Sequence, residues 1–387
     1  KRELPRLRAN LYCFTVPKEL RDFRLWGKLT YGDLIKAKLD HSELVCAWHQ
    51  AIDEQFSLAG FTQVEEQFAD HILQSEGIIL VLGPKDPPVE YLTNLQALVS
   101  STSNSNVGEV LDRDLVDQDW TPELVDAKRD IAGFLRKQLA VNNTLVVQGP
   151  PGTGKTHMIA ELCAKYLEEG ASVLVTALTN RALLEVAGKP ALEPWLTRKK
   201  VYKSNLTLDE KRVLPSLEAL HGPGPMPGHL ILATFFVASG YARELAGEAP
   251  YDLVVVDEAS QALLGMLAAA KALGQQNVWV GDVRQLPPVV ETDRDKVERT
   301  GAAAFVDGLR ALTASCAYPV YQLTHSHRLP PRAARYTGMF YQDSLRSAKA
   351  GDELLDFAGM DPAFANWFHP EGGPTLLQVP MDPADAR

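Results

Sequence analysis

Short runs of continuously apolar residues recur through the middle of the chain. The clearest are residues 144–147, 173–177, 230–234, 253–256 and 277–280. Strands that are buried on both faces of a parallel sheet show such unbroken runs, whereas half-exposed strands alternate apolar with polar residues. The pattern therefore predicts the parallel sheet of an α/β fold.

Helical patterns precede and follow the first run. After residue 158, apolar side chains recur with the spacing of one helix face, and Gly170 predicts where that helix ends. Upstream, Thr121 and Pro122 offer an N-cap and a proline at the first helical position. They predict a helix from there to about Leu139.

Two other stretches depart from this succession of predicted strands and helices. Before the sheet, residues 77–82 predict a buried strand and residues 87–99 a short helix, and the polar run 100–106 predicts a loop or linker. Between Gly188 and Gly228 the succession of predicted strands and helices breaks, and we expect an insertion on the sheet domain. The insertion is rich in basic residues: Arg198, Lys199, Lys200, Lys203, Lys211 and Arg212.

Composition restricts the class of protein. The 387 residues are 45% apolar and 23% charged, which is ordinary for a globular chain of two or three domains. We find no signal peptide and no apolar run of the about 20 residues that a membrane helix needs, so we expect a cytoplasmic protein without membrane partners. Four widely spaced cysteines argue against a disulfide framework or a zinc site. The chain starts at Lys1, and we expect it to be part of a longer protein.

The net charge of −10 counts against nucleic-acid binding, because phosphates require basic partners. However, seven acidic residues are concentrated between Glu109 and Asp126. Net charge therefore leaves the question open.

A phosphate-binding motif follows the first apolar run. Residues 149–156 read Gly-Pro-Pro-Gly-Thr-Gly-Lys-Thr, a complete G-x-x-x-x-G-K-[ST] pattern between a predicted strand and a predicted helix. The backbone N–H groups of such a loop surround phosphates, Lys155 supplies a charge to the β- and γ-oxygens, and Thr156 offers its hydroxyl to Mg²⁺. The sequence therefore predicts a site for a nucleoside triphosphate.

Two carboxylates stand at the end of the run 253–256, where ligands of open α/β sheets bind. Asp257 is predicted to hold Mg²⁺ together with Thr156, and Glu258 to polarise the attacking water. The next run ends in Gly281-Asp282, followed by Gln285 and two prolines. Gln285 is predicted to contact both the γ-phosphate and the water, and so to respond to the nucleotide state.

Together these motifs resemble those of the superfamily-one helicases. The order is Gly-Pro-Pro-Gly-Thr-Gly-Lys-Thr, then Asp257-Glu-Ala-Ser-Gln, then Gly281-Asp-x-x-Gln-Leu-Pro-Pro. The likeness is greatest to the 5′→3′ branch that contains the nonsense-mediated-decay RNA helicase and the flap-processing DNA helicase–nucleases. It covers roughly residues 122–346, with Leu323-Thr-His-Ser-His-Arg-Leu-Pro similar to the element that opens the second motor domain and Phe340-Tyr341 similar to the aromatic pair after it.

The resemblance implies roles for further residues. Arg328 would reach the γ-phosphate as an arginine finger, and His327 would stack on the base of ATP. Thr179, Asn180 and Thr234 would contact the backbone of the nucleic acid, with Lys199, Lys200 and Lys203 of the basic insertion nearby. The residues expected to contact the nucleotide are Gly149, Pro150, Gly152, Thr153, Gly154, Lys155, Thr156, His157 and His327.

The resemblance also implies a domain organisation. We expect residues 1–108 to form an accessory domain, often a small barrel in this family, with a linker. A RecA-like motor domain would occupy residues 109–315, with the basic insertion at about 188–229, and an incomplete second motor domain would occupy residues 316–387. The chain lacks the family's later motifs, and residues 126–132 lack the adenine-reading glutamine that the family has at this place.

We therefore expect an ATP-dependent helicase or translocase on single-stranded nucleic acid, with DNA slightly favoured over RNA. An alternative is an ATP-gated clamp that recruits a nuclease or another effector without unwinding. A small-molecule kinase would share the phosphate loop but lacks the other two motifs.

Overall fold

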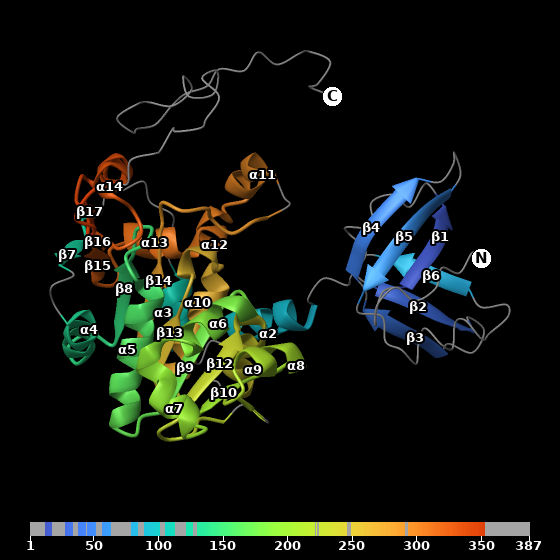
Figure 1. The fold of residues 1–387 in the computed structure, drawn as a ribbon, viewed down its shortest axis with the longest axis horizontal. Coiled ribbons are helices and arrows are strands. Elements are labelled where there is room, and N and C mark those ends of the chain that lie inside the picture. Colours follow the sequence, from blue (N-terminus) through green and yellow to red (C-terminus); the bar gives the residue numbers. More distant parts are fainter. Residues whose placement is uncertain are drawn as a thin grey trace, which may run out of the picture. The chain divides into compact units, whose positions relative to one another are not determined.

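A computed structural model of the chain describes residues 12–17, 28–33, 38–43, 45–51, 56–62, 79–83, 89–100, 105–112, 121–126, 130–220, 222, 224–245, 249–290 and 293–352 (Figure 1). The chain divides into two compact units, Lys1–Glu90 and Tyr91–Arg387. Each is described by itself.

The first unit is built from antiparallel strands. One three-stranded sheet has the order β1-β5-β4, formed by β1 (Tyr12–Pro17), β5 (Phe56–Thr62) and β4 (Val45–Ala51). A second has the order β3-β2-β6, formed by β3 (Lys38–Glu43), β2 (Lys28–Asp33) and β6 (Ile79–Gly83). β6 overlaps the strand predicted at 77–82, and the small barrel stays a prediction.

The second unit contains a nine-stranded sheet in which every pair of neighbours is parallel. Its order is β11 (Glu218–Ala219), β10 (Val201–Lys203), β12 (Leu230–Thr234), β9 (Val173–Ala177), β13 (Tyr251–Val256), β14 (Gly274–Gly281), β8 (Thr144–Gln148), β15 (Val320–Leu323) and β7 (Glu123–Val125). All five apolar runs are strands of this sheet. The α/β class and the parallel sheet are confirmed.

The apolar runs are unbroken because the sheet has a core on each face. Leu145 and Val147 pack in one hydrophobic cluster, whereas Val146, between them in β8, packs in the other. The first face is covered by α4 (Ile131–Leu139), α5 (Lys155–Glu168), α6 (Asn180–Ala187), η3 (Pro190–Leu192) and α7 (Glu193–Thr197). The second is covered by α2 (Val89–Ser100), α3 (Ser105–Leu111), α9 (Phe235–Glu244), α10 (Leu264–Leu273) and α13 (Gly308–Ala314).

Short elements complete this unit. They are α8 (Leu208–Val213), η4 (Ala259–Gln261), α11 (Arg294–Arg299), α12 (Ala303–Val306), β16 (His325–Ser326), α14 (Pro331–Gly338), η5 (Met339–Tyr341) and β17 (Arg346–Ser347). None of the helices in the described part of the chain has the length and apolar character that a transmembrane helix requires.

The helix predicted from Thr121 to Leu139 is wrong in its first half. Residues Glu123–Val125 form strand β7 beside β15, and α4 begins only at Ile131. Asp130 is its N-cap, because its carboxylate accepts a hydrogen bond of 2.9 Å from the N–H of Gly133. The Thr-Pro pair thus precedes a strand at the sheet edge rather than a helix.

The expected domain boundaries also need correction. Helices α2 and α3 pack into the core of the second unit through Leu95, Leu98 and Val110, so the sheet unit begins before residue 109. Strand β15 pairs with β8, and the boundary at 315/316 therefore lies inside the sheet unit. In the basic segment, β10 and β11 extend the sheet instead of forming a separate insertion.

Candidate nucleotide and nucleic-acid site

The phosphate loop joins β8 to α5 at the carboxyl edge of the sheet. Gly152 and Gly154 have φ of 76° and 79°, the left-handed region that glycine occupies without steric cost. The hydroxyl of Thr153 donates to the carbonyl of Pro150 at 2.8 Å and closes the loop. At its start, the N–H of Gly149 donates to the carbonyl of Gly281 at 2.9 Å, which ties the loop to the neighbouring strand β14.

Lys155 lies folded back on this loop. Its Nζ donates to the carbonyl of Gly149 at 2.6 Å, and a side chain at position 149 would overlap the Lys155 methylenes. Burial lowers the pKa of Lys155, and the carboxylates of Asp282 and Asp257 oppose that effect. A half-buried ammonium of this kind is suited to receive the negative charge of a phosphate.

Asp257 follows β13 and is 4% exposed. Burial raises its pKa to about 6, while a hydrogen bond of 2.9 Å from the N–H of Glu258 opposes the rise. A nearby cation stabilises the charged form of a buried carboxylate whose pKa is raised. Its oxygens, together with the hydroxyl of Thr156, are the hard donors that Mg²⁺ prefers, so the residues present fit this ion.

Glu258 has a backbone conformation that is rare for a side-chain-bearing residue, with φ of 52°. Burial, followed by the charge of Glu185, raises the pKa of its carboxyl group. A carboxylate whose pKa lies nearer to neutrality is a better general base. Asp257 and Glu258 therefore differ in burial as well as in their predicted roles.

Asp282 connects three parts of the chain at the end of β14. It is 1% exposed, and its carboxylate accepts hydrogen bonds from the amide of Gln148, from the amide of Gln285 at 2.8 Å and from the hydroxyl of Tyr341 at 2.8 Å. Burial raises the pKa of Tyr341, so its hydroxyl remains a donor. In the sequence, Asp282 and Tyr341 are visible only as parts of two separate motifs, and their hydrogen bond was not predicted.

The segment after β15 lies directly on the phosphate loop. The N–H of His327 donates to the carbonyl of Gly152 at 2.9 Å, and the hydroxyl of Ser326 donates to the carbonyl of Pro151 at 2.9 Å. Any side chain at Gly152 would overlap the Cβ atom of Arg328. Arg328 and His327 are exposed and lie at the loop, and their contacts with the γ-phosphate and the base stay predictions. The anchoring of Ser326 to the loop was not predicted from the sequence.

The predicted backbone-contacting residues lie at the same edge of the sheet. Thr179 and Asn180 follow β9 and are exposed, and Thr179 caps α6 by accepting from the N–H of Ala182 at 3.2 Å. Thr234 ends β12 and pairs in register with Ala177 of β9. His157, also expected at the nucleotide, is exposed in the first turn of α5 and lies 3.1 Å from Glu161.

The three predicted lysines do not join this edge. Lys203 has no exposed side chain: its Nζ donates to Glu210 at 3.1 Å and to the carbonyl of Ser204, so its assignment to nucleic-acid binding is corrected. Lys199 and Lys200 precede β10 and therefore lie at the amino edge of the parallel sheet. Lys200 lines a cavity of about 800 Å³ together with Trp195 and Arg198.

Several known proteins are similar to this chain. The model of a family described as an AAA domain matches residues 135–291. The DNA replication ATP-dependent helicase/nuclease DNA2 of Saccharomyces cerevisiae is 23% identical over 295 residues, which cover 69% of this chain and 18% of that protein. The ATP-dependent RecD2 DNA helicase of Deinococcus radiodurans is 26% identical over 282 residues, which cover 67% of this chain and 35% of that protein.

A solved structure of arterivirus nonstructural protein 10, a helicase, aligns with a TM-score of 0.39 and 14% identity, over 88% of this chain and 59% of the viral chain. The fold and the loop define an α/β domain of the phosphate-loop class. With the two relatives and the three motifs in order, the chain is similar to the motor domain of the superfamily-one helicases. It spans about a third or less of the length of these two relatives.

Proposed function

We propose that this chain is the motor of an ATP-dependent helicase or translocase that acts on single-stranded nucleic acid. The observation that carries the proposal is the convergence of Lys155, Asp257, Gln285 and Arg328 at one edge of the sheet, beside Thr179 and Thr234. The phosphate-binding groups and the candidate strand-binding groups are thus supported by neighbouring strands.

Each residue has a defined part in the proposed cycle. Lys155 leaves the carbonyl of Gly149 for the β- and γ-phosphate oxygens, and Thr156 and Asp257 hold Mg²⁺, which neutralises phosphate charge when bound. Glu258 accepts the proton of the attacking water. Arg328 stabilises the charge that develops on the γ-phosphate, and His327 stacks on the base.

Gln285 and Asp282 provide the proposed coupling to movement. Gln285 donates to Asp282 at 2.8 Å, and Asp282 also accepts from Gln148, which immediately precedes the phosphate loop, and from Tyr341. A change at the γ-phosphate that moves Gln285 would therefore alter the hydrogen bonds of Asp282. Through Tyr341 it would also displace the segment that carries Arg328.

DNA is the proposed substrate because one relative is named for DNA replication and the other as a DNA helicase. A nuclease, fused or bound, is a possible associate because the yeast relative is named as a helicase/nuclease. The proposed domain organisation has two further parts. They are the unit of residues 1–90 and the start of a second motor domain after β15.

Translocation tests the proposal. The full-length protein should displace streptavidin from a biotinylated single strand when ATP is present, and Glu258→Gln should abolish displacement while still binding nucleotide. As a matched control, Glu193→Gln changes an exposed glutamate on α7 and should displace normally. ATP-dependent strand binding without displacement would instead support the clamp.

A further inference from the structure

The loop that carries Gln285 packs only loosely on the sheet unit. Leu286 and Val289 are 80% and 94% exposed, and Pro287 and Pro288 have no backbone N–H to donate. A cavity of about 340 Å³ borders the loop and is lined by Gln285 itself. Because little packing holds the loop, the attachments at its two ends determine where it lies.

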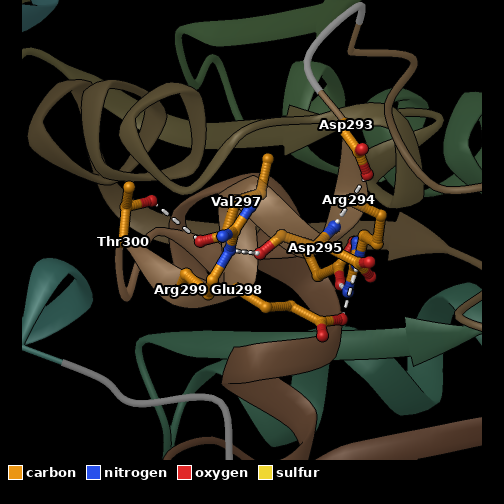
Figure 2. Close-up of polar contacts among 8 residues, drawn as sticks. Asp293, Arg294, Asp295, Val297, Glu298, Arg299 and Thr300 are labelled. Carbon is orange, nitrogen blue, oxygen red and sulfur yellow. Dashed lines mark hydrogen bonds and ion pairs between the residues drawn. The ribbon is translucent and has the colours of Figure 1, made fainter.

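Each end of the loop is attached by a polar side chain. At the first end, the amide of Gln285 donates to Asp282 at 2.8 Å. At the other end α11 begins with Arg294, whose Nη2 donates to Asp307 at 2.5 Å and whose Nε donates to Glu298 at 3.0 Å (Figure 2). Among the described residues of the loop and of α11, Arg294 makes the one polar side-chain bond that reaches a later helix.

Asp307 is a rigid partner for this bond. It lies between α12 and α13 and is 5% exposed, and its Oδ1 is buried without a hydrogen-bond partner in the described part of the chain. The charge of Arg294 therefore compensates a buried carboxylate, which is costly to leave unpaired. At Gly308, a Cβ atom would lie 2.7 Å from the backbone nitrogen of Leu264, so the start of α13 packs directly on the start of α10.

The start of α13 also touches the ends of the two strands that carry the catalytic motifs. At Gly281, the last residue of β14, a Cβ atom would lie 2.7 Å from Leu309 Cδ2 and 2.7 Å from the backbone nitrogen of Ser260. Ser260 follows Glu258 by two residues. The start of α13, the end of β14 and the segment after Glu258 are thus in direct contact, and they form one support.

We propose that Arg294 is a positioning residue for Gln285. By binding Asp307, Arg294 attaches the far end of the loop to the support that also carries Glu258. The amide of Gln285 and the carboxylate of Glu258 then keep the separation at which both reach one attacking water, and such orientation is a large part of a rate enhancement. Arg294 acts through the loop and not on the nucleotide. This inference rests on the proposed function, which assigns Gln285 and Glu258 to ATP hydrolysis.

Steady-state ATP hydrolysis by the full-length protein, with a saturating single-stranded DNA, tests the inference. Arg294→Ala should lower kcat by about 10- to 100-fold, the size of effect that a misplaced catalytic group produces. The KM for ATP should hardly change, because the phosphate loop that binds the nucleotide is left intact. Arg294→Lys keeps a cation beside Asp307 and should recover part of the lost kcat.

A second variant separates positioning from folding, since Arg294→Ala leaves the buried charge of Asp307 without its cation. Arg294→Met combined with Asp307→Asn removes both charges and keeps their approximate volumes. Its thermal unfolding midpoint should stay close to that of the wild type. Its kcat should nevertheless be as low as that of Arg294→Ala, because the loop has lost its attachment.

A double-mutant cycle identifies the residue through which Arg294 acts. Gln285→Ala should itself lower kcat, and adding Arg294→Ala to it should cause no further loss. An arginine that only stabilises the fold would instead lower kcat by the same factor in both backgrounds. Arg299→Ala is the matched control, because this exposed arginine of α11 donates only to the carbonyl of Asp295, at 3.2 Å, among the described residues (Figure 2). It should hydrolyse ATP at the wild-type rate.

Wild-type kcat in Arg294→Ala, or the same loss with and without Gln285, would overturn the positioning role alone. Wild-type kcat in Gln285→Ala would overturn the role of Arg294 together with the assignment of Gln285. A wild-type protein that does not hydrolyse ATP would overturn the proposed function and the inference that rests on it.

Discussion

The carboxyl edge of the sheet and the basic segment at residues 198–212 both concentrate charge, yet they differ in what the charges face. In the basic segment three of the basic side chains pair with nearby carboxylates: Lys203 with Glu210, Lys199 with Glu218, and Arg212 with Asp209. At the carboxyl edge, Lys155 donates only to a carbonyl, and Asp257 and Glu258 carry raised pKa values without an ion-pair partner in the described residues.

A run of charges in a sequence is therefore not a binding site by itself. Charges that neutralise each other within the fold stabilise local structure, whereas charges held apart from partners are arranged for a ligand. Substitutions at the carboxyl edge should therefore reduce activity, whereas substitutions in the basic segment should reduce stability.

The largest effect is expected at Arg328. Arg328→Ala should lower the turnover number for ATP by about 10³-fold or more, the size seen for arginine fingers in other NTPases. Thermal stability should hardly change, because the side chain is exposed. Arg212→Ala, an exposed arginine of the basic segment, is the control and should hydrolyse ATP at the wild-type rate; a similar loss in both would remove the contrast between the regions.

Lys203→Ala should show the opposite behaviour. Removing one partner of the buried pair leaves Glu210 without its cation and should lower the free energy of unfolding by about 3 kcal/mol. Denaturant unfolding measures this loss. The fraction that remains folded should bind single strands as well as the wild type does, and a selective loss of strand binding would restore Lys203 as a contact residue.

The contribution of Asp257 to the free energy of unfolding depends on pH, and Asp257→Asn measures it. The pKa of Asp257 is raised in the folded state from 3.8 to about 6, so the folded protein binds this proton more tightly than the unfolded chain. The aspartate therefore costs stability that is absent below pH 3.8, grows between pH 3.8 and 6 and is complete above pH 6.

Without Mg²⁺, Asp257→Asn should accordingly raise the free energy of unfolding at pH 7.5 by on the order of 2 kcal/mol. The gain should shrink as the pH falls toward 4. A gain that is independent of pH would contradict a buried, titrating carboxylate at this position.

The smallest effect is expected at Tyr341. Tyr341→Phe removes one hydrogen bond to Asp282, which should lower the free energy of unfolding by about 1 kcal/mol. If this bond couples the segments, strand stimulation of ATP hydrolysis should fall while the basal rate is retained. Tyr336→Phe, an exposed tyrosine of α14, should change neither quantity.

The sequence predicted the central strands well because each is long enough to show its apolar run. Strands β9 and β12 have the predicted bounds, Val173–Ala177 and Leu230–Thr234. β10 and β11 have only three and two residues, which is too short for a pattern to stand out, and the stretch was therefore interpreted as an insertion.

Motif positions likewise predicted that the candidate site residues lie at one edge of the sheet, since the ends of parallel strands share that edge; the roles of these residues stay predictions. The links through Asp282, Tyr341 and Ser326 could not be predicted. They depend on the sheet order, which places β14 beside β8 and β15 on its other side, and on the path of the chain after β15. The burial of Lys203 could not be predicted either, because its partner Glu210 lies on α8, across a turn from β10.

The central claim is that nucleotide hydrolysis at the carboxyl edge is coupled to a bound strand. Steady-state ATP hydrolysis by the full-length protein, with and without a saturating single-stranded DNA, tests it most directly. We expect at least a tenfold stimulation by the strand, and we expect Lys155→Ala to abolish it. A rate that is the same with and without the strand would contradict it.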